Sequence, residues 1–201
     1  MHIIGITGCS GSGKSSFCEK LKETLIQKNF TVCFITSDWF YKTMPHENCN
    51  YDTPLAFDFQ PLITAINNRK LTKLPSYDYV HHCSIPDVNV YDPNVDFVII
   101  EGIMIYNDLE LRELFNTRIF IQTDLDACLA RRLLRDKVQR GRTPEGVIEQ
   151  WFATVKQGYE SFIEPSSKYA HYIFNNTKMC IDENIKQDDR LEQLLLKLTK
   201  H

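Results

Sequence analysis

The chain has 201 residues, 43% of them hydrophobic and 24% charged, which is enough for one well-buried α/β domain with a small insertion but not for a second full domain. Its formal net charge of −3 gives no indication of a nucleic-acid or membrane partner, because both favour basic surfaces, and a small-molecule substrate fits better. Seven scattered cysteines without CxxC spacing, together with the lack of a basic and apolar leader or a long apolar run, predict a reduced, cytoplasmic protein without a membrane span.

The first predicted element is a buried strand over residues 3–7, which runs directly into a glycine-rich loop. The loop reads Gly8-Cys9-Ser10-Gly11-Ser12-Gly13-Lys14-Ser15, followed by Ser16, and it matches the phosphate-binding pattern G-x-x-x-x-G-K-[ST]. In such a loop, backbone N–H groups and the start of the next helix bind phosphate oxygens. Lys14 is expected to reach the β- and γ-phosphates, and the Ser15 hydroxyl is expected to ligate Mg²⁺.

A glycine-rich turn without a ligand is the alternative interpretation of this loop. The residues that follow argue against it, because Phe17, Leu21 and Leu25 recur at the spacing of one helical face. A strand before the loop and a helix after it are the context that the motif requires. We therefore predict that residues 8–16 bind a nucleoside triphosphate.

A second strand is predicted over residues 31–36, and Asp38 follows its end. In open parallel sheets, functional residues lie just past the carboxyl ends of the strands. An aspartate here could also be a surface cap or turn residue. Phosphoryl transfer to an alcohol, however, needs a carboxylate that accepts the hydroxyl proton and helps to hold Mg²⁺, and we assign that role to Asp38.

Residues 42–54 are too polar for the core, and a helix over about 59–68 is predicted to bury Leu62, Ile63 and Ile66. The alternating, aromatic-rich stretch that follows predicts an inserted β-hairpin over about 74–92.

Within this hairpin, Tyr77 and Tyr79 share one face and can wall a ligand pocket. The run His81-His82-Cys83 does not predict zinc. Adjacent strand residues point to opposite faces, and no second ligand pair is suitably spaced.

The apolar run 96–102 predicts a central strand that is buried on both faces and ends in Glu101. A surface glutamate at the strand end is the alternative. At this position a carboxylate can hold Mg²⁺ directly or through water, so we include Glu101 in the metal site. A short helix over 108–115 and a strand over 118–123 are predicted next.

The helix predicted over 126–142 carries five arginines, Arg131, Arg132, Arg135, Arg140 and Arg142, with Gly141 between the last two. Most charge runs are solvated faces. In a chain of net charge −3, this concentration instead predicts a mobile lid whose guanidinium groups close on a polyphosphate.

The last part of the chain is predicted to hold two helices and a strand. A helix is predicted to start with Thr143 as its N-cap and Pro144 as its first residue, and to contain Gln150 and Trp151. The last strand is predicted over 169–174. Asp188 is expected to cap a final helix whose apolar stripe is Leu191, Leu194, Leu195 and Leu198.

Six short motifs together resemble one known family, the uridine–cytidine kinases of the P-loop kinase superfamily. They are Gly8 to Ser15, Asp38-Trp39-Phe40-Tyr41, Tyr51-Asp52-x-Pro54-x-Ala56-Phe57-Asp58, Tyr77-Asp78-Tyr79-Val80-x-His82, Glu101-Gly102-Ile103, and Arg131-Arg132-x-x-Arg135-Asp136 through Arg140-Gly141-Arg142. The resemblance covers the chain from Ile3 to about Tyr172. It implies a single nucleoside kinase domain over 1–201 with a parallel five-stranded sheet flanked by helices, an inserted hairpin at about 74–92 and an arginine-rich lid at about 131–145.

The resemblance also implies an activity, in which ATP phosphorylates the 5′-hydroxyl of uridine or cytidine in pyrimidine salvage. Asp38 would be the general base and a Mg²⁺ ligand with Ser15 and Glu101, and Lys14, Arg140 and Arg142 would act in catalysis. Substrate contacts would come from Asp52 at the ribose hydroxyls, Tyr77 and His82 at the pyrimidine edge, Tyr41 and Tyr51 beside them, and Arg132, Arg142 and Gln150 around the sugar and the phosphoryl path. Arg135 and Arg140 would neutralise the triphosphate. By the same resemblance, the protein would form a homo-oligomer, commonly a tetramer.

Some choices stay open at the level of sequence. Residues 175–178 read Asn-Asn-Thr-Lys where the family often has a basic residue, a glycine and an acid near the adenine, which leaves ATP or GTP open as donor. Tyr51 replaces a usual Phe. The acceptor could instead be phosphoribulose, pantothenate or nicotinamide riboside, which Tyr77 and His82 disfavour. A nucleotide-operated switch generally needs an N-K-x-D guanine motif, and none occurs in the chain.

Overall fold

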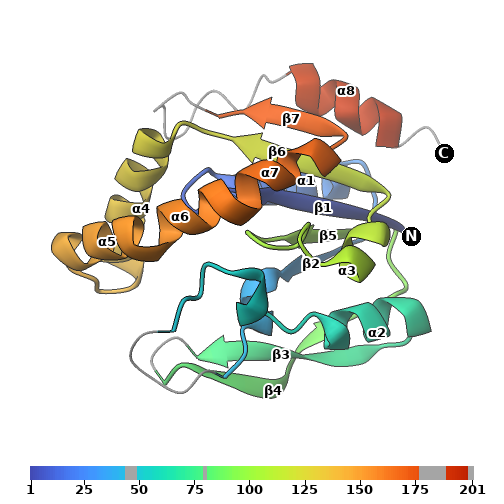
Figure 1. The fold of residues 1–201 in the computed structure, drawn as a ribbon. Coiled ribbons are helices and arrows are strands. Elements are labelled where there is room, and N and C mark those ends of the chain that lie inside the picture. Colours follow the sequence, from blue (N-terminus) through green and yellow to red (C-terminus); the bar gives the residue numbers. More distant parts are fainter. Residues whose placement is uncertain (44–48, 79–80, 177–188, 199–201) are drawn as a thin grey trace.

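The computed structural model describes residues 1–43, 49–78, 81–176 and 189–198, and in the last range it describes the side chains of residues 193–197 (Figure 1). Its centre is a sheet of five parallel strands in the order β2-β5-β1-β6-β7. The strands are β1 (His2–Gly8), β2 (Val32–Thr36), β5 (Phe97–Glu101), β6 (Thr117–Gln122) and β7 (Tyr172–Asn175). The predicted α/β fold with a five-stranded parallel sheet is confirmed.

Helices cover both faces of this sheet, which is why all five residues of β5 are buried. On one face, Leu21 and Leu25 of α1 (Lys14–Gln27) pack in one cluster with Ile4, Ile99 and the buried Leu194 and Leu195 of α8 (Asp189–Leu198). The predicted stripe of the last helix is thus confirmed at Leu194 and Leu195. Asp188 and the side chains of Leu191 and Leu198 lie outside the described residues.

A long helical segment crosses the other face of the sheet (Figure 1). It begins with α5 (Pro144–Gln150) and continues through α6 (Lys156–Gly158) and α7 (Glu164–Ser166), with π-helical turns at Trp151–Val155 and Tyr159–Ile163. Its buried face consists of Trp151, Val155, Tyr159 and Ile163, at intervals of four residues. As predicted, Pro144 opens the helix, and the Thr143 hydroxyl caps it by accepting from the Gly146 N–H at 3.2 Å.

The predicted hairpin forms a separate two-stranded sheet of β3 (Thr72–Asp78) and β4 (Cys83–Tyr91), paired antiparallel below the main sheet in Figure 1. Next to it lies α2 (Gln60–Asn68), which buries Leu62, Ile63 and Ile66 as expected. Tyr77 is buried, whereas Tyr79 lies outside the described residues.

The strand register brings the predicted functional residues to one edge of the sheet. Glu101 ends β5 and pairs with Ile6 of β1 on one side and with Thr36 of β2 on the other. The glycine-rich loop follows β1, and Asp38 lies in a 3₁₀ turn that follows β2 (Ser37–Phe40). Loop, Asp38 and Glu101 are therefore neighbours through strand order alone, as the topology of parallel sheets requires.

Two element boundaries lie three residues from the predicted ones, while the others agree within two residues. The arginine-rich helix α4 spans Leu125–Gln139 and stops before Gly141, whose φ of 61° is left-handed. The last strand begins at Tyr172 and not at residue 169. Tyr169 instead closes a 3₁₀ turn, with the Arg112 guanidinium 3.8 Å from its ring centre and its carbonyl accepting from Arg118 Nε at 2.7 Å, and these contacts hold it off the sheet.

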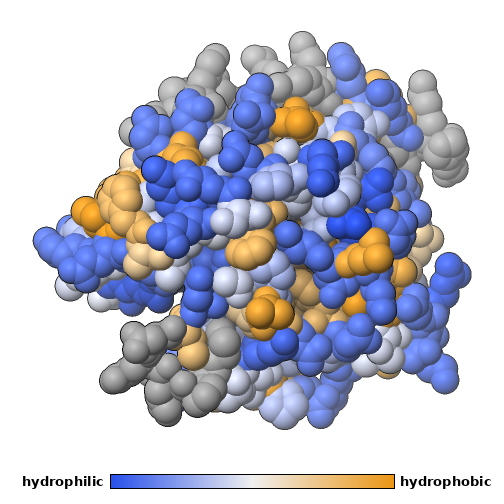
Figure 2. Space-filling model, viewed as in Figure 1, coloured by the Kyte–Doolittle hydropathy of each residue, from blue (hydrophilic) through white to orange (hydrophobic). Residues whose placement is uncertain are grey.

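The remaining helix, α3 (Leu109–Glu113), lies within the predicted 108–115 and is capped by Asp108. Among the described residues, we find no helix whose length and hydrophobicity would carry it across a bilayer. Figure 2 shows a largely hydrophilic surface on this side, with apolar residues in small separate groups.

Candidate active site

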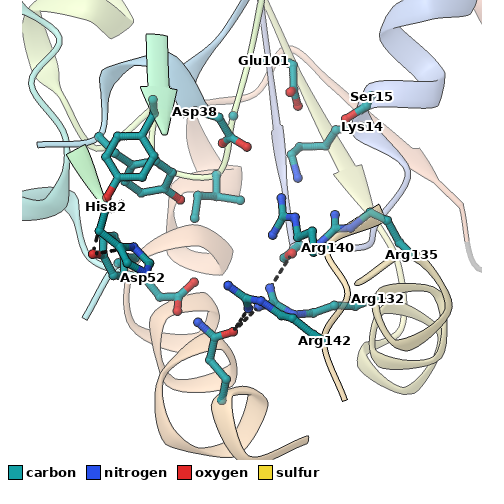
Figure 3. Close-up of a pocket in the computed structure, with 17 residues that line it drawn as sticks. Lys14, Ser15, Asp38, Asp52, His82, Glu101, Arg132, Arg135, Arg140 and Arg142 are labelled. Carbon is teal, nitrogen blue, oxygen red and sulfur yellow. Dashed lines mark hydrogen bonds between the residues drawn. The ribbon is translucent and has the colours of Figure 1, made fainter. Parts of the chain in front are cut away.

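One pocket opens at the edge of the sheet where the strand ends meet (Figure 3). It is lined by the predicted site residues Ser10, Lys14, Ser15, Asp38, Tyr41, Tyr51, Asp52, Tyr77, His82, Glu101, Arg132, Arg135, Arg140, Arg142 and Gln150, and by Gly102 and Ile103. The other residues predicted to bind phosphate, Gly8, Cys9, Gly11, Ser12, Gly13 and Ser16, belong to the adjoining loop and the first turn of α1 and are not among the residues that line the pocket. Five cationic and three acidic side chains face the pocket, so positive charge is in excess there.

The glycine-rich loop is anchored through the carbonyl group of Ser12, which accepts from three side chains outside the loop. The Ser12 carbonyl accepts from Thr123 Oγ1 at 3.0 Å and from Asn176 Nδ2 at 2.8 Å, and Arg131 Nη1 lies at 3.4 Å. Gly13 has a φ of 92°, and a Cβ atom there would collide with the Asn176 amide. The loop can therefore curl and turn its N–H groups toward the pocket only with glycine at this position.

Lys14 begins α1 and lies over the loop, where its Nζ donates to the Cys9 carbonyl at 2.9 Å. In Figure 3 its ammonium group points into the pocket beside Ser15. The helix N-terminus adds partial positive charge at the same place. This corner of the pocket is built for an anion.

Asp38 and Glu101 form the acidic corner next to it. The Asp38 N–H donates to Thr36 Oγ1 at 3.3 Å, and that hydroxyl donates to Glu101 Oε1 at 2.9 Å, so one threonine couples the two strand ends. Burial raises the pKa of Glu101, and the Asp38 carboxylate raises it further, whereas Lys14 opposes the shift. A raised pKa means that burial disfavours the ionised form more than Lys14 stabilises it.

This corner fits a Mg²⁺ ion. Ser15, Asp38 and Glu101 present one hydroxyl and two carboxylates from three neighbouring segments of one pocket wall. Mg²⁺ prefers such oxygen ligands and commonly takes only one or two carboxylates, completing its shell with water and substrate phosphates. A cation bound there would also stabilise the ionised form of Glu101, which burial disfavours.

Asp52 lies on the opposite side of the pocket from the phosphate-binding loop (Figure 3). Its carboxylate is buried, and Oδ2 accepts from the Thr154 hydroxyl at 2.7 Å. Burial raises the pKa of Asp52, opposed by this hydrogen bond and by Arg132 and Arg142. Gly158 packs against it so closely that a Cβ atom would collide with the Asp52 backbone, and the helical segment 144–169 thereby fixes where the carboxylate lies.

An aromatic wall completes this side of the pocket. The Tyr51 hydroxyl lies 3.2 Å from His82 Nδ1 and accepts from the Tyr77 hydroxyl at 3.4 Å. The Tyr51 and His82 rings are stacked with centroids 5.6 Å apart, and Tyr41 packs against both Tyr51 and Tyr77. Tyr41 follows the 3₁₀ turn after β2, Tyr51 lies in a loop, and Tyr77 and His82 belong to the hairpin. These segments are far apart in the sequence, yet the four residues form one surface that can contact a flat ring and its polar edge.

The arginines line the remaining side, and Gln150 joins two of them. Its Oε1 accepts from Arg132 Nη2 at 2.7 Å and from Arg142 Nη1 at 2.6 Å, while Arg132 Nη1 donates to Ser10 Oγ at 2.8 Å. Burial lowers the pKa of Arg132, and the carboxylates of Asp136 and Asp52 raise it. Of the five arginines in the run, Arg131 does not line the pocket, because it donates to the Asn176 carbonyl at 2.9 Å behind the loop.

Sequence analysis missed three residues that shape the site. Thr154 holds Asp52, Asn176 holds the loop at Ser12, and Asp136 lies fully buried among the arginines. A signal existed for Asp136, since it stands four residues after Arg132 and four before Arg140. No spacing rule could have found Thr154 or Asn176, because their partners lie more than a hundred residues away.

Comparison with known proteins gives consistent matches. The model of the Phosphoribulokinase / Uridine kinase family matches residues 3–180. The chain is 38% identical over 180 residues to a uridine kinase from Macrococcus caseolyticus, covering 85% of this chain and 86% of that one. It is 37% identical over 192 residues to a uridine kinase from Staphylococcus carnosus, covering 90% and 91%. Among solved structures, phosphoribulokinase from Rhodobacter spheroides superposes with a TM-score of 0.61 at 14% identity, covering 87% of this chain and 69% of that one, which is a likeness of fold.

Proposed function

Since this chain belongs to the Phosphoribulokinase / Uridine kinase family, and is thus an ATP-dependent phosphotransferase, we propose that its acceptor is a pyrimidine ribonucleoside, uridine or cytidine, phosphorylated at the 5′-hydroxyl. One observation carries the proposal. The pocket has a phosphate-binding loop on one side, a buried aspartate with an aromatic and histidine wall on the other, and Asp38 between them (Figure 3).

The acceptor side suits a nucleoside. Asp52 Oδ2 is already engaged by Thr154, and the rest of its carboxylate faces the pocket, where it can accept hydrogen bonds from the ribose 2′- and 3′-hydroxyls. Tyr77 and His82 can donate to or accept from the polar edge of a pyrimidine. A sugar phosphate would instead bring a second anion to Asp52, which disfavours phosphoribulose as acceptor.

The donor side suits a triphosphate. The loop, Lys14, Arg135 and Arg140 surround the region where its β- and γ-phosphates would lie. Ser15, Asp38 and Glu101 would hold a Mg²⁺ ion, which when bound would neutralise charge on the phosphates. We propose ATP as the ordinary donor, with GTP as a second candidate because Asn175 and Asn176 replace the usual family sequence.

The chemistry then needs one proton acceptor. Asp38 takes the proton of the 5′-hydroxyl while the oxygen of that hydroxyl bonds to the γ-phosphorus. The bond between the γ-phosphorus and the β–γ bridging oxygen breaks, and ADP leaves. Lys14, Arg140 and Arg142 stabilise the negative charge on the transferring group. Asp52 contributes by fixing the ribose, which sets the direction of attack.

A coupled assay of nucleoside diphosphate release, ADP from ATP and GDP from GTP, over a panel of acceptors tests this proposal. The panel contains uridine, cytidine, 2′-deoxycytidine, thymidine, ribulose 5-phosphate, pantothenate and nicotinamide riboside, each with ATP or GTP and with or without Mg²⁺. We expect uridine and cytidine to give the highest kcat/KM, and only with Mg²⁺. A higher kcat/KM for any non-pyrimidine acceptor would overturn the proposed substrate. Release of nucleoside diphosphate at the same rate with and without an acceptor would overturn the acceptor site itself.

A further inference from the structure

Asp136 lies at the centre of the arginine cluster on α4. Its side chain is 0% exposed, although it stands in a run of charged residues that would ordinarily face solvent. Four guanidinium groups that line the pocket surround this one carboxylate. The ion-pair distances are 2.8 Å to Arg135, 3.5 Å to Arg132, 3.8 Å to Arg140 and 3.9 Å to Arg142.

The backbone strengthens this arrangement. The N–H groups of Arg140 and Arg142 both donate to the Asp136 carbonyl at 3.1 Å. The turn around Gly141 is therefore folded back onto Asp136, and it brings two guanidinium groups from beyond the end of α4 to the same carboxylate.

The cluster has more donors than acceptors. Asp136 Oδ1 accepts from Arg135 Nε at 2.8 Å, but Asp136 Oδ2 and Arg132 Nε are buried and make no hydrogen bond to any described residue. Gln150 Oε1 and the hydroxyl of Ser10 are further acceptors of these arginines. Each guanidinium offers five N–H donors, so the cluster can accommodate further anionic oxygens without losing those it has.

One negative charge cannot balance four positive charges in an enclosed space, but it reduces their mutual repulsion. Without Asp136, the four guanidinium groups would repel one another and, where they could, turn toward water. With it, they are collected on one side of the pocket before any ligand arrives. Preorganisation of this kind matters for catalysis, because groups already in place need no reorganisation during the reaction.

We propose that Asp136 is a positioning residue for phosphoryl transfer: it is the internal counter-anion that gathers Arg132, Arg135, Arg140 and Arg142 on one side of the pocket in the free enzyme. The inference rests on the proposed function for its catalytic consequence. Asp136 itself contacts no substrate and acts through the arginines.

The test uses Asp136→Asn, which keeps the size of the side chain and an acceptor for Arg135 but removes the charge. The matched control is Asp126→Asn, an identical change of charge at an exposed position on the same helix. Sodium tripolyphosphate serves as the anion probe. Three quantities are compared: kcat and KM for uridine phosphorylation, the dissociation constant of tripolyphosphate by calorimetry, and the rise in Tm that tripolyphosphate causes.

We expect Asp136→Asn to lower kcat by at least about tenfold, because the arginines are no longer prealigned. Tripolyphosphate should bind the variant about threefold more tightly than wild type, and should therefore raise the Tm of the variant more than that of wild type, since the anion supplies the missing counter-charge. The control should match wild type in all three. The proposal is overturned by a kcat within about twofold of wild type, or by a Tm rise equal to or below that of wild type.

If Asp136→Asn does not fold, the proposal is tested on the wild-type protein by NMR of the arginine side chains. The ¹⁵Nε–¹Hε resonances of Arg132 and Arg135 should be dispersed and slow to exchange with water before any anion is added, and rapid exchange like that of free arginine would overturn the proposal. The tripolyphosphate and resonance measurements do not depend on the acceptor. If wild type fails to phosphorylate uridine, the proposed function fails while these two readouts still judge Asp136.

Discussion

At the scale of single residues, three carboxylates line the pocket, and their surroundings give them different tasks. Asp38 lies in the acidic corner of the pocket, Glu101 is buried near Lys14 in the same corner, and Asp52 is fixed by Thr154 on the opposite side. Thr36 connects Asp38 to Glu101, so these two act in one corner, while Asp52 acts alone.

Asp38→Asn tests the proposed general base. The change keeps the shape of the side chain but removes its ability to accept the 5′-hydroxyl proton, and we expect kcat to fall by about 10²–10⁴-fold. Uridine should still bind in a calorimetric titration, because the acceptor side is intact. Retention of more than about a tenth of wild-type kcat would show that another group takes the proton.

Asp52→Ala tests the recognition of the ribose. Wild type should prefer uridine to 2′-deoxyuridine by about 10²-fold in kcat/KM, because the deoxy sugar leaves a buried acceptor unpaired. The variant should lose activity mostly with uridine, so that the ratio collapses. Measuring both substrates on both proteins closes a double-mutant cycle, and an unchanged ratio would make Asp52 a turn residue only.

The raised pKa of Asp52 also predicts how stability depends on pH. Folding favours the protonated form of Asp52. The free energy of unfolding therefore falls as pH rises from 3.8, the ordinary pKa of aspartate, through the raised pKa of the folded protein, and above that pKa the full loss of stability remains. Asp52→Asn removes this cost. Its Tm should equal or exceed that of wild type near neutral pH, with a difference that shrinks toward about pH 4, and a variant less stable at neutral pH would contradict the account.

At the scale of elements, the arginine-rich helix and its turn form one side of the site. The turn at Gly141 has a left-handed φ, and a Cβ atom there would meet nothing within 4 Å, so open space surrounds it. We expect residues 135–145 to gain protection from amide hydrogen exchange when a non-hydrolysable ATP analogue binds, beyond the protection that the contacts with Asp136 give in the free protein, as closure over the phosphates excludes water. Equal protection in both states would sink the idea of a closing lid.

The elements also show which parts of the site could be predicted. The ends of β1, β2 and β5 follow from apolar runs and the loop motif, and the strand order of the sheet places Lys14, Asp38 and Glu101 together. The burial of Asp136 could not be predicted, because a sequence pattern records spacing and not burial.

Thr154 shows a second limit. It lies in a π-helical turn, where the helical phase shifts, so counting residues from Gln150 does not tell which way its side chain points. Its partner Asp52 is 102 residues away in the chain. Such a contact depends on how the helical segment 144–169 packs across the sheet, which no local pattern contains.

At the scale of the whole molecule, the pocket joins parts of the chain that are distant in sequence. The hairpin supplies Tyr77 and His82 to the acceptor side, the segment after β6 supplies the arginines, and the central sheet supplies the loop and the acids between them. From this arrangement we expect ATP and the nucleoside to meet in the pocket with the ribose 5′-carbon directed at the phosphate-binding loop.

The most direct measurement of that claim is the structure of the product. The protein is incubated with ATP, Mg²⁺ and uridine, and the new phosphate is assigned by ³¹P–¹H correlation NMR while ADP is quantified in the same sample. We predict one nucleotide formed for each ADP, with its phosphorus coupled to the two 5′-methylene protons of uridine. A phosphate coupled to a 2′- or 3′-proton, or ADP accompanied only by inorganic phosphate, would contradict the account.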